Sequence, residues 1–428
     1  MIQKTHVVNL TPQVRLHLIH SEKFKTDLLS VSLARPLTAH EAVHNTLVTR
    51  VLERGTEKYP TFTQLSSRLD ELYGAILVAD ATKFGEKHVI DFKMQYLNAK
   101  HLGGNDLLAE ALEVLDEIMF RPLFVAGVFN ADFVAQEVQN LKDEIAARVN
   151  DKIQYGIEKC IETMCADEPY HVHQFGDLET LETVTPQSLT AHYKEVMTNS
   201  FVDVVVIGDI DFNAVENRMR LQFPMKGQTQ VNLPNEVFVP SVSEAKRYSE
   251  HYPIQQEKIA IGYRTGIQYT DEAYESSAVM SQILGGGANS LLFQNVREKE
   301  SLCYYIFSSL EKYKGIMLIG AGIEATNTEK TLDLIDFYVE EMKAGNFTDS
   351  DLQLAKKSIV SSVDAISDYP NSFVNYYYSF ALFNKKFDLG AFKTRIESVT
   401  HEDVVEAAKK LSKDTTYLMQ EADNNETD

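Results

Sequence analysis

Two histidines and a glutamate near the N-terminus have the spacing of a zinc site. His40, Glu41 and His44 read H-E-x-x-H within the stretch TAHEAVHNTLVTRVLERGT, residues 38–56. On a helix, residues i and i+4 share one face, so two imidazoles can bind one zinc ion while the glutamate serves as general base. A metallopeptidase site is therefore the first hypothesis that these residues raise.

The helix that must carry these residues favours a different interpretation. Thr38 is the expected N-cap, and Glu41, three residues later, completes a T-x-x-E capping box that explains the glutamate without catalysis. At about 100° per residue, His40 and His44 fall on the apolar face of the helix. A third histidine would be expected at position 50, where the chain has Arg50. We interpret the two histidines as packed side chains, and a zinc protease that uses them remains an alternative.

The wider chain contains two halves with the same order of elements. The segments ETVTPQSLTAHYKEVM (182–197) and ESVTHEDVVEAAKKLS (397–412) place a Val-Thr pair before an amphipathic helix, 215 positions apart, and each precedes a strand. Upstream, FNADFVAQEVQNLKDEI (129–145) and FTDSDLQLAKKSIVSSV (347–363) also match. This repetition predicts an internal duplication and two similar domains.

The fold class expected for each half is α+β. Strand patterns at 88–97, 258–267 and 315–324 lie between helical segments and predict a mainly antiparallel sheet packed with helices in each domain. A proline-containing polar segment, 223–243, is interpreted as a linker between domain 1–222 and domain 244–428. The acidic end, 421–428, is expected to be a disordered tail.

Composition excludes some classes of partner. The 428 residues are 44% hydrophobic and carry a formal net charge of −21, which disfavours binding to nucleic acid or to anionic membranes. No signal-peptide or membrane-spanning run is visible, and three cysteines form no disulfide framework, so a cytoplasmic location is expected. Cys165, His171 and His173 lack a regular ligand spacing, and we interpret them as packing residues.

Two longer stretches resemble the insulinase/pitrilysin-type peptidases, the inverzincins. They are VLERGTEKYPTFTQLSSRLDELYGA (51–75) and LGGGANSLLFQNVREKESLCYY (284–305), of which the second is the more specific. The resemblance covers essentially the whole chain. It implies two metallopeptidase-like domains, of the kind that enclose a peptide chamber in that family, and an inverted zinc motif, H-x-x-E-H.

In the family's register, the zinc motif of this chain is degenerate. Counting back from Gly55-Thr56, the motif would occupy residues 46–50, where Thr46, Thr49 and Arg50 replace the two histidines and the glutamate. The resemblance further implies that Glu137 and Glu144 are the family's retained glutamates. One ligand cannot hold zinc, and a guanidinium repels a divalent cation. The H-E-x-x-H lies six residues earlier, about 9 Å along the helix, and cannot substitute. No metal or cofactor is therefore expected in this chain.

The second half keeps two residues that, in the resembled family, lie across the peptide chamber from the zinc domain. The resemblance implies that Arg297 and Tyr304 contact the substrate, and a guanidinium and a phenol can both donate to a scissile carbonyl as it becomes an oxyanion. Two departures from the family pattern are Ser301, where glycine is common, and Leu291, where arginine is common. The triple glycine 285–287 lacks the G-K-[ST] of a phosphate loop and is interpreted as a tight connection or a substrate-facing loop.

These features predict a catalytically incomplete peptidase subunit. The expected partner is a homologue that carries zinc and its glutamate base, in a heterodimer that cleaves peptides, and this chain would supply Arg297 and Tyr304. The alternative is a non-enzymatic scaffold or peptide-binding subunit of a larger complex, with self-association into a homodimer also open. The sequence names neither the substrate nor the partner.

Overall fold

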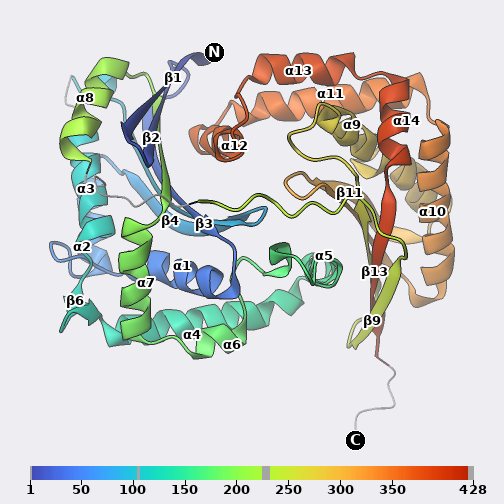
Figure 1. Ribbon diagram of the computed structural model, residues 1–428, viewed down its shortest axis with the longest axis horizontal. Coiled ribbons are helices and arrows are strands. Elements are labelled where there is room, and N and C mark those ends of the chain that lie inside the picture. Colours follow the sequence, from blue (N-terminus) through green and yellow to red (C-terminus); the bar gives the residue numbers. More distant parts are fainter. Residues whose placement is uncertain (1, 104–106, 224–231, 423–428) are drawn as a thin grey trace, which may run out of the picture. The chain divides into compact units, whose positions relative to one another are not determined.

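The chain folds into two compact units. The computed structural model describes residues 2–103, 107–223 and 232–422. One unit comprises residues 1–146, 172–235 and 367–379, and the other comprises 147–171, 236–366 and 380–428. The two units divide near residue 235, within the expected linker at 223–243. In addition, residues 147–171 from the first half of the chain belong to the second unit, and residues 367–379 from the second half belong to the first unit. Figure 1 shows the elements of both units.

The first unit is built on a six-stranded mixed sheet with the order β1-β2-β8-β3-β5-β4. All neighbours are antiparallel except β2 and β8, which are parallel. The central strands are buried almost throughout, as their runs of Val, Leu and Ile require. The strands are β1 (Ile2–Thr11), β2 (Val14–Ser21), β3 (Thr26–Pro36), β4 (Ile76–Phe84), β5 (Lys87–Leu97) and β8 (Phe201–Gly208).

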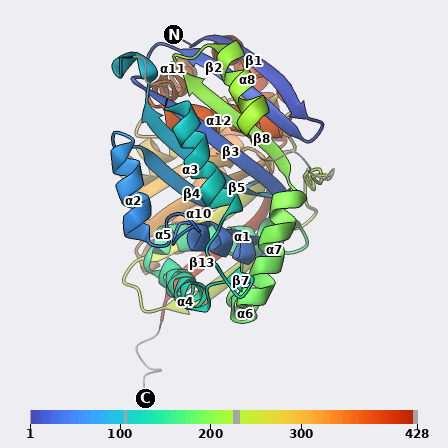
Figure 2. The same cartoon turned by 90° about the vertical axis from the view of Figure 1, so that its left-hand side faces the viewer.

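Helices cover one face of this first sheet (Figure 2) and bury a continuous apolar core against it. They are α1 (Ala39–Leu52), α2 (Phe62–Glu71), α3 (Leu108–Phe120), α4 (Ala131–Ala147), α6 (Leu178–Glu182), α7 (Pro186–Thr198) and α8 (Phe212–Gln222). A small hairpin, β6 (Phe124–Val125) and β7 (Val128–Phe129), and the short turn η1 (Ala99–His101) complete the set. Most of α12 (Pro370–Leu382) also belongs to this unit.

The second unit repeats this plan with a five-stranded sheet, in the order β11-β12-β10-β13-β9. Here β13 and β9 are the parallel pair. The strands are β9 (Lys246–Tyr252), β10 (Glu257–Arg264), β11 (Cys303–Glu311), β12 (Ile316–Ile323) and β13 (Ser412–Glu421). The helices are α9 (Tyr274–Gly285), α10 (Thr328–Ala344), α11 (Asp349–Ile366), α13 (Leu389–Ser398) and α14 (His401–Lys409), with short turns η2 (Arg148–Asn150), η3 (Pro169–His171), η4 (Phe293–Lys299) and η5 (Ala325–Asn327).

The exchanged helices follow the duplication. α5 (Lys152–Met164), from the first half of the chain, packs Ile157, Cys160 and Met164 against β10, β12 and β13 of the second unit. α12 has the same place in the second half, after a long helix, and its first ten residues pack in the first unit. Each half therefore gives one helix to the other half's sheet.

The expected α+β class and the duplication are confirmed. Read from the edge strand inward, β4-β5-β3-β8-β2 of the first sheet corresponds to β11-β12-β10-β13-β9 of the second. The two Val-Thr pairs also have equivalent roles. Thr185 begins α7 and Thr400 begins α14, and each forms a capping box with the residue three positions later, Ser188 or Asp403.

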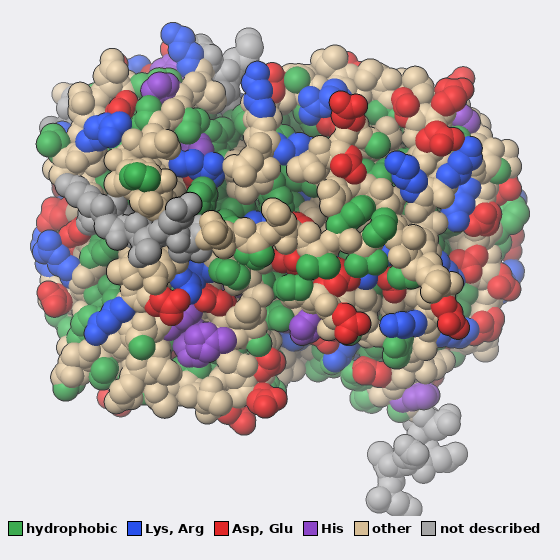
Figure 3. Space-filling view, in the orientation of Figure 1, with side chains coloured by type: hydrophobic (Ala, Val, Ile, Leu, Met, Phe, Trp, Pro, Cys, Tyr) green, Lys and Arg blue, Asp and Glu red, His purple; other side chains and the backbone are tan. Residues whose placement is uncertain are grey.

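Surface charge and helix hydrophobicity bear on the predicted partners and location. Acidic and basic side chains are interspersed over the face drawn in Figure 3. Within the described ranges, no helix has both the length and the apolar character that crossing a bilayer requires. The cytoplasmic location stays a prediction. Part of the predicted linker, 224–231, and most of the predicted tail, 423–428, lie outside the described residues.

Candidate functional site

Helix α1 positions the residues of the degenerate zinc motif. Thr46 and Thr49 are buried, and their hydroxyls donate to the backbone oxygens of Ala42 (2.8 Å) and Thr46 (2.9 Å). Arg50, one residue further on, is partly exposed and extends its guanidinium to Glu144. The two hydroxyls are thus committed to the helix backbone, which leaves them poor candidates for metal ligands.

The two family glutamates on α4 are neutralised by Arg50 in the last turn of α1 and by Arg54, which follows that helix. A guanidinium nitrogen of Arg50 lies 2.5 Å from a carboxylate oxygen of Glu144. One turn away, Arg54 makes an equivalent ion pair with Glu137 at 3.1 Å. Glu137 is buried, whereas Glu144 is more exposed. The structure therefore brings the predicted residues of α1 and α4 together, but as ion pairs.

These residues do not fit a zinc ion. Zinc needs three or four nitrogen, sulfur or carboxylate donors around one point. Here the single carboxylate of Glu144 already has a positive partner, and that partner is fixed on the helix that would supply the imidazoles. The guanidinium of Arg50 supplies the positive charge that a zinc ion would have supplied, and it repels a metal ion from this position. No metal-dependent step is assigned to this position.

The H-E-x-x-H of α1 differs in part from its predicted role. Thr38 caps the helix by accepting from the Glu41 backbone N–H at 3.1 Å, as expected. The carboxylate of Glu41, however, forms a two-pronged ion pair with Arg35, both contacts at 2.6 Å, rather than the return bond of a capping box. His44 is buried as predicted, whereas His40, in the first turn, is exposed and packs by stacking its ring on that of His44.

Sequence reasoning missed a third histidine at this place. His192 comes from α7, which lies beside α1 (Figures 1 and 2), and its ring centroid is 5.1 Å from that of His44 and 5.3 Å from that of His40. His192 is buried, and its separation of 148 residues from His44 hides the cluster from any local pattern. Burial, followed by interactions with the neighbouring His44 and Arg35, lowers the pKa of His192 to about 2.

Arg297 lies on an irregular helical turn of the second unit. The turn η4 has π-helical geometry, which is rare and frequent at functional sites. The Arg297 guanidinium lies 4.5 Å from the ring centroid of Phe293 and 3.4 Å from the carboxylate of Glu298. Its side chain is 37% exposed. Arg297 is thus held loosely at the surface by its own turn rather than in a buried salt bridge.

Tyr304 lies on the edge strand β11, next to a break in the strand pairing. Cys303 pairs with Ile323 and Tyr305 with Gly322, so Tyr304 is the extra residue of a bulge. The side chain is 50% exposed, and its hydroxyl donates to Glu324 at 3.0 Å. That hydrogen bond raises the pKa of the Tyr304 phenol, which keeps it a neutral donor. Bulges often redirect a side chain toward a site.

Ser301, between Arg297 and Tyr304, departs from the family pattern at a position whose backbone favours glycine. Ser301 has φ = 55°, in the left-handed region where glycine is favoured. We expect Ser301→Gly to raise the free energy of unfolding by about 0.5–1 kcal/mol, because the native backbone then carries no side-chain penalty. Denaturant unfolding of the two proteins measures this difference. Equal or lower stability of the variant would show that the serine is not strained.

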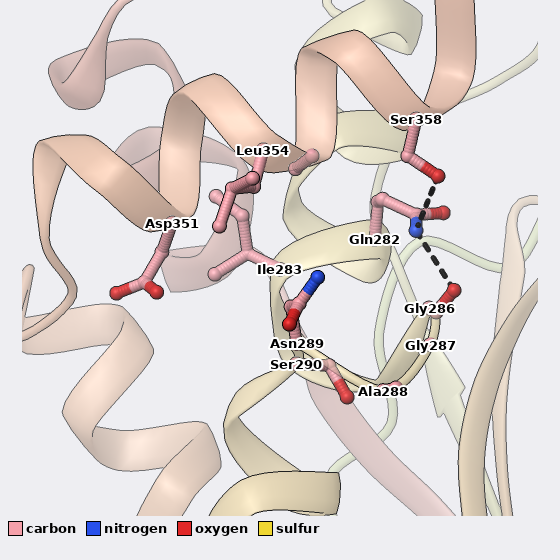
Figure 4. Close-up of a pocket in the computed structure, with 11 residues that line it drawn as sticks. Gln282, Ile283, Gly286, Gly287, Ala288, Asn289, Ser290, Asp351, Leu354 and Ser358 are labelled. Atoms are coloured by element: carbon pink, nitrogen blue, oxygen red, sulfur yellow. Dashed lines mark hydrogen bonds between the residues drawn. The ribbon is translucent and has the colours of Figure 1, made fainter. Parts of the chain in front are cut away.

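The triple glycine forms a tight connection at the end of α9 (Figure 4). A side chain on Gly285 would collide with the backbone of Ser308 on β11, so the close approach of helix and strand requires glycine. Gln282 donates to the backbone oxygen of Gly286 at 2.8 Å and to Ser358 at 3.2 Å. A small cleft beside the loop is lined by residues of α9, the loop and α11. The predicted tight connection is the geometry that the loop adopts.

Comparison with known proteins is consistent with these features. A family model described as "Peptidase M16 inactive domain" matches residues 183–359. The chain is 35% identical to the "Probable inactive metalloprotease YmfF" of Bacillus subtilis, over 94% of this chain and 95% of that relative. It is 23% identical to the "Uncharacterized zinc protease YmxG" of the same organism, over 61% of this chain and 62% of that relative.

Solved structures agree with the fold. A conserved protein from Enterococcus faecalis V583 matches with a TM-score of 0.93 and 28% identity, over 99% of this chain and 100% of that one. These matches identify the family of the chain. The ion-paired glutamates and the degenerate zinc motif agree with a member that does not bind the family's zinc. The chain belongs to the M16 peptidases, the insulinase/pitrilysin-type family, as an inactive metalloprotease homologue.

Proposed function

We propose that this chain is the catalytically incomplete subunit of a two-subunit M16-type peptidase. A homologous partner supplies the zinc ion and its glutamate base. This chain supplies part of the peptide-binding surface together with Arg297 and Tyr304, which donate hydrogen bonds to the carbonyl of the scissile bond as negative charge develops on it.

The observation that carries the proposal is an asymmetry between the two units. At the former zinc site, Arg50 and Arg54 neutralise the retained glutamates Glu144 and Glu137. In the second unit, Arg297 and Tyr304 remain partly exposed on irregular elements. A protein with no link to peptide hydrolysis would have no reason to retain the second pair while the first site is closed.

One organism contains two relatives of this chain whose names match the two roles in this proposal. Bacillus subtilis has both YmfF, named as a probable inactive metalloprotease, and YmxG, named as a zinc protease. Both are similar to this chain. That one organism has a relative named as a probable inactive metalloprotease and another named as an uncharacterized zinc protease supports a division of labour between two subunits.

An exposed strand edge suits a peptide as the ligand. β4 is the edge strand of the first sheet, and Ile76 and Val78 on it are exposed. An extended peptide can add to an edge strand, and apolar side chains beside it add contact area. On β4 the backbone N–H groups of Ala79 and Ala81 already donate to the carboxylates of Glu53 and Asp80, each at 2.8 Å, so a peptide would pair with the remaining backbone groups. This feature alone also supports the second candidate, a peptide-binding subunit without a role in catalysis.

Reconstitution separates the two candidates. The chain is mixed with the zinc-bearing homologue from the same genome, and hydrolysis of a quenched fluorescent peptide library is compared with that of each protein alone. Incomplete-subunit function predicts a complex whose rate exceeds the sum of the separate rates by at least tenfold. A complex that binds peptide with no gain in rate would favour the non-catalytic candidate.

A further inference from the structure

The His40, His44 and His192 cluster holds a buried imidazole nitrogen, Nδ1 of His192, without a hydrogen-bond partner among the described residues. His44 donates from Nδ1 to the backbone oxygen of His40 at 2.9 Å, and since a carbonyl only accepts, the Nε2 of His44 carries the lone pair. Buried polar nitrogens are rarely left unpaired, so Nδ1 of His192 requires an explanation.

A chain of hydrogen bonds fixes which nitrogen of His192 is unprotonated. His88 must donate from Nε2 to the backbone oxygen of Gln174 at 2.9 Å, so its Nδ1 accepts from the Asn45 side-chain amide at 3.0 Å. The amide oxygen of Asn45 then accepts from Nε2 of His192 at 2.8 Å. The lone pair of His192 is therefore on Nδ1, the atom without a partner.

This arrangement is the one that metal-binding histidines use. In such sites the second ring nitrogen of each ligand donates to a carbonyl or amide oxygen, which orients the ring and leaves the other nitrogen for the ion. A metal ligand must also be uncharged, and the side chains of His44 and His192 are both buried, where a charged ring is disfavoured.

We propose that His40, His44 and His192 form a binding site for a divalent transition-metal ion that prefers imidazole ligands, with Zn²⁺ as the representative ion. His44 and His192 are the preset ligands. His40 now stacks on His44 at a centroid distance of 4.0 Å, and because it is exposed its ring turns to complete the site. All residues of the site and its hydrogen-bond chain belong to the first unit.

The site is not a peptidase centre. Glu41, the residue that would act as general base, is held by two contacts from Arg35. A third contact of Arg35, to Glu195 at 2.8 Å, fixes the guanidinium between the two carboxylates. The metal therefore links α1 and α7 and stabilises the first unit, as a structural ion does.

Zn²⁺ titration of the chelator-treated full chain tests the proposal, with a chromophoric chelator as competitor. The expected result is one Zn²⁺ per chain, with affinity about tenfold to a hundredfold weaker in His40→Ala. His40 is exposed, so this variant does not disturb the core. Co²⁺ in place of Zn²⁺ should give visible absorption in the natural chain, and that absorption should be lost in His40→Ala.

A control variant addresses the competing site. His20, Glu22 and Asp209 are the described group whose ligand atoms already lie within 4.8 Å of one another, although Lys100 is paired with Asp209 there. Glu22→Ala should leave Zn²⁺ affinity unchanged. Absence of binding, equal affinity of His40→Ala and the natural chain, or loss of binding in Glu22→Ala alone would each overturn the proposal. Because the readout is metal affinity, these outcomes are independent of peptide hydrolysis.

Discussion

Replacing Arg297 with alanine should lower kcat of the reconstituted two-subunit peptidase by about 10²–10³-fold. Loss of one preorganised donor to a developing oxyanion has an effect of this size, because the negative charge that forms in the transition state is left without its partner. Tyr304→Phe, which removes only the hydroxyl, should have an effect in the same direction. If the donors act mainly in the transition state, kcat falls while KM changes little.

Two controls make the result specific. Lys299→Ala removes an exposed positive charge from the same turn as Arg297 and should leave kcat unchanged. Arg297→Lys keeps the charge but loses the planar fork, and should recover only part of the rate. Size-exclusion chromatography checks that each variant still binds its partner. Unchanged turnover in both Arg297→Ala and Tyr304→Phe would assign the pair a purely structural role.

The second large effect is expected on stability, at a buried cluster of four charges in the second unit. Arg264, 2% exposed at its side chain, contacts Glu168 and Asp414, each at 2.7 Å. Lys314, fully buried, lies 2.7 Å from the other oxygen of Glu168. The two cations and two carboxylates balance. Arg264→Met leaves an uncompensated negative charge and should lower the free energy of unfolding by about 3–5 kcal/mol.

The double variant Arg264→Met/Asp414→Asn restores neutrality and should recover part of that loss. The exposed pair of Lys330 and Glu300 provides the surface comparison, where Lys330→Ala should change stability by less than about 1 kcal/mol. Denaturant unfolding measures all three variants. A loss in Arg264→Met no greater than in Lys330→Ala would contradict the account of this cluster.

The same cluster predicts how stability depends on acid. Burial acts to raise the pKa of Glu168, but hydrogen bonds from Arg264 and Lys314 outweigh it, and the pKa is lowered below its usual 4.5. The folded state therefore binds fewer protons than the unfolded state just below that value. The stabilisation is present above pH 4.5 and is lost as the pH falls toward the folded pKa. In Arg264→Met, the free energy of unfolding should fall less steeply as the pH decreases below 4.5, because one of the two groups that lower the pKa of Glu168 is absent.

Much of the fold follows from local patterns in the sequence. The two Val-Thr pairs that begin α7 and α14 are visible because a capping residue and an amphipathic helix are local features. The exchange of α5 and α12 is not visible, since the apolar face of a helix does not specify which of two similar sheets it covers. The sequence shows the order of the elements, and tertiary packing decides their partners.

The candidate sites also contain features that one stretch of sequence reveals and contacts that only the structure reveals. The loss of the zinc motif at Thr46, Thr49 and Arg50 could be read from one stretch of residues. That Arg50 neutralises Glu144 required the structure, because 94 residues separate the two. The position of His192 beside His44 likewise depends on how α1 and α7 pack, and no spacing rule reports it.

The most direct test of the central claim is peptide hydrolysis by the purified chain alone, with Zn²⁺ added in excess, against hydrolysis by the chain with its zinc-bearing homologue. We predict no turnover above the blank for the lone chain, even if Zn²⁺ binds at the His40, His44 and His192 cluster, and chelator-sensitive turnover for the pair. Chelator-sensitive hydrolysis by the lone chain would contradict the account, since Arg50 and its ion pair with Glu144 leave no place for a catalytic zinc.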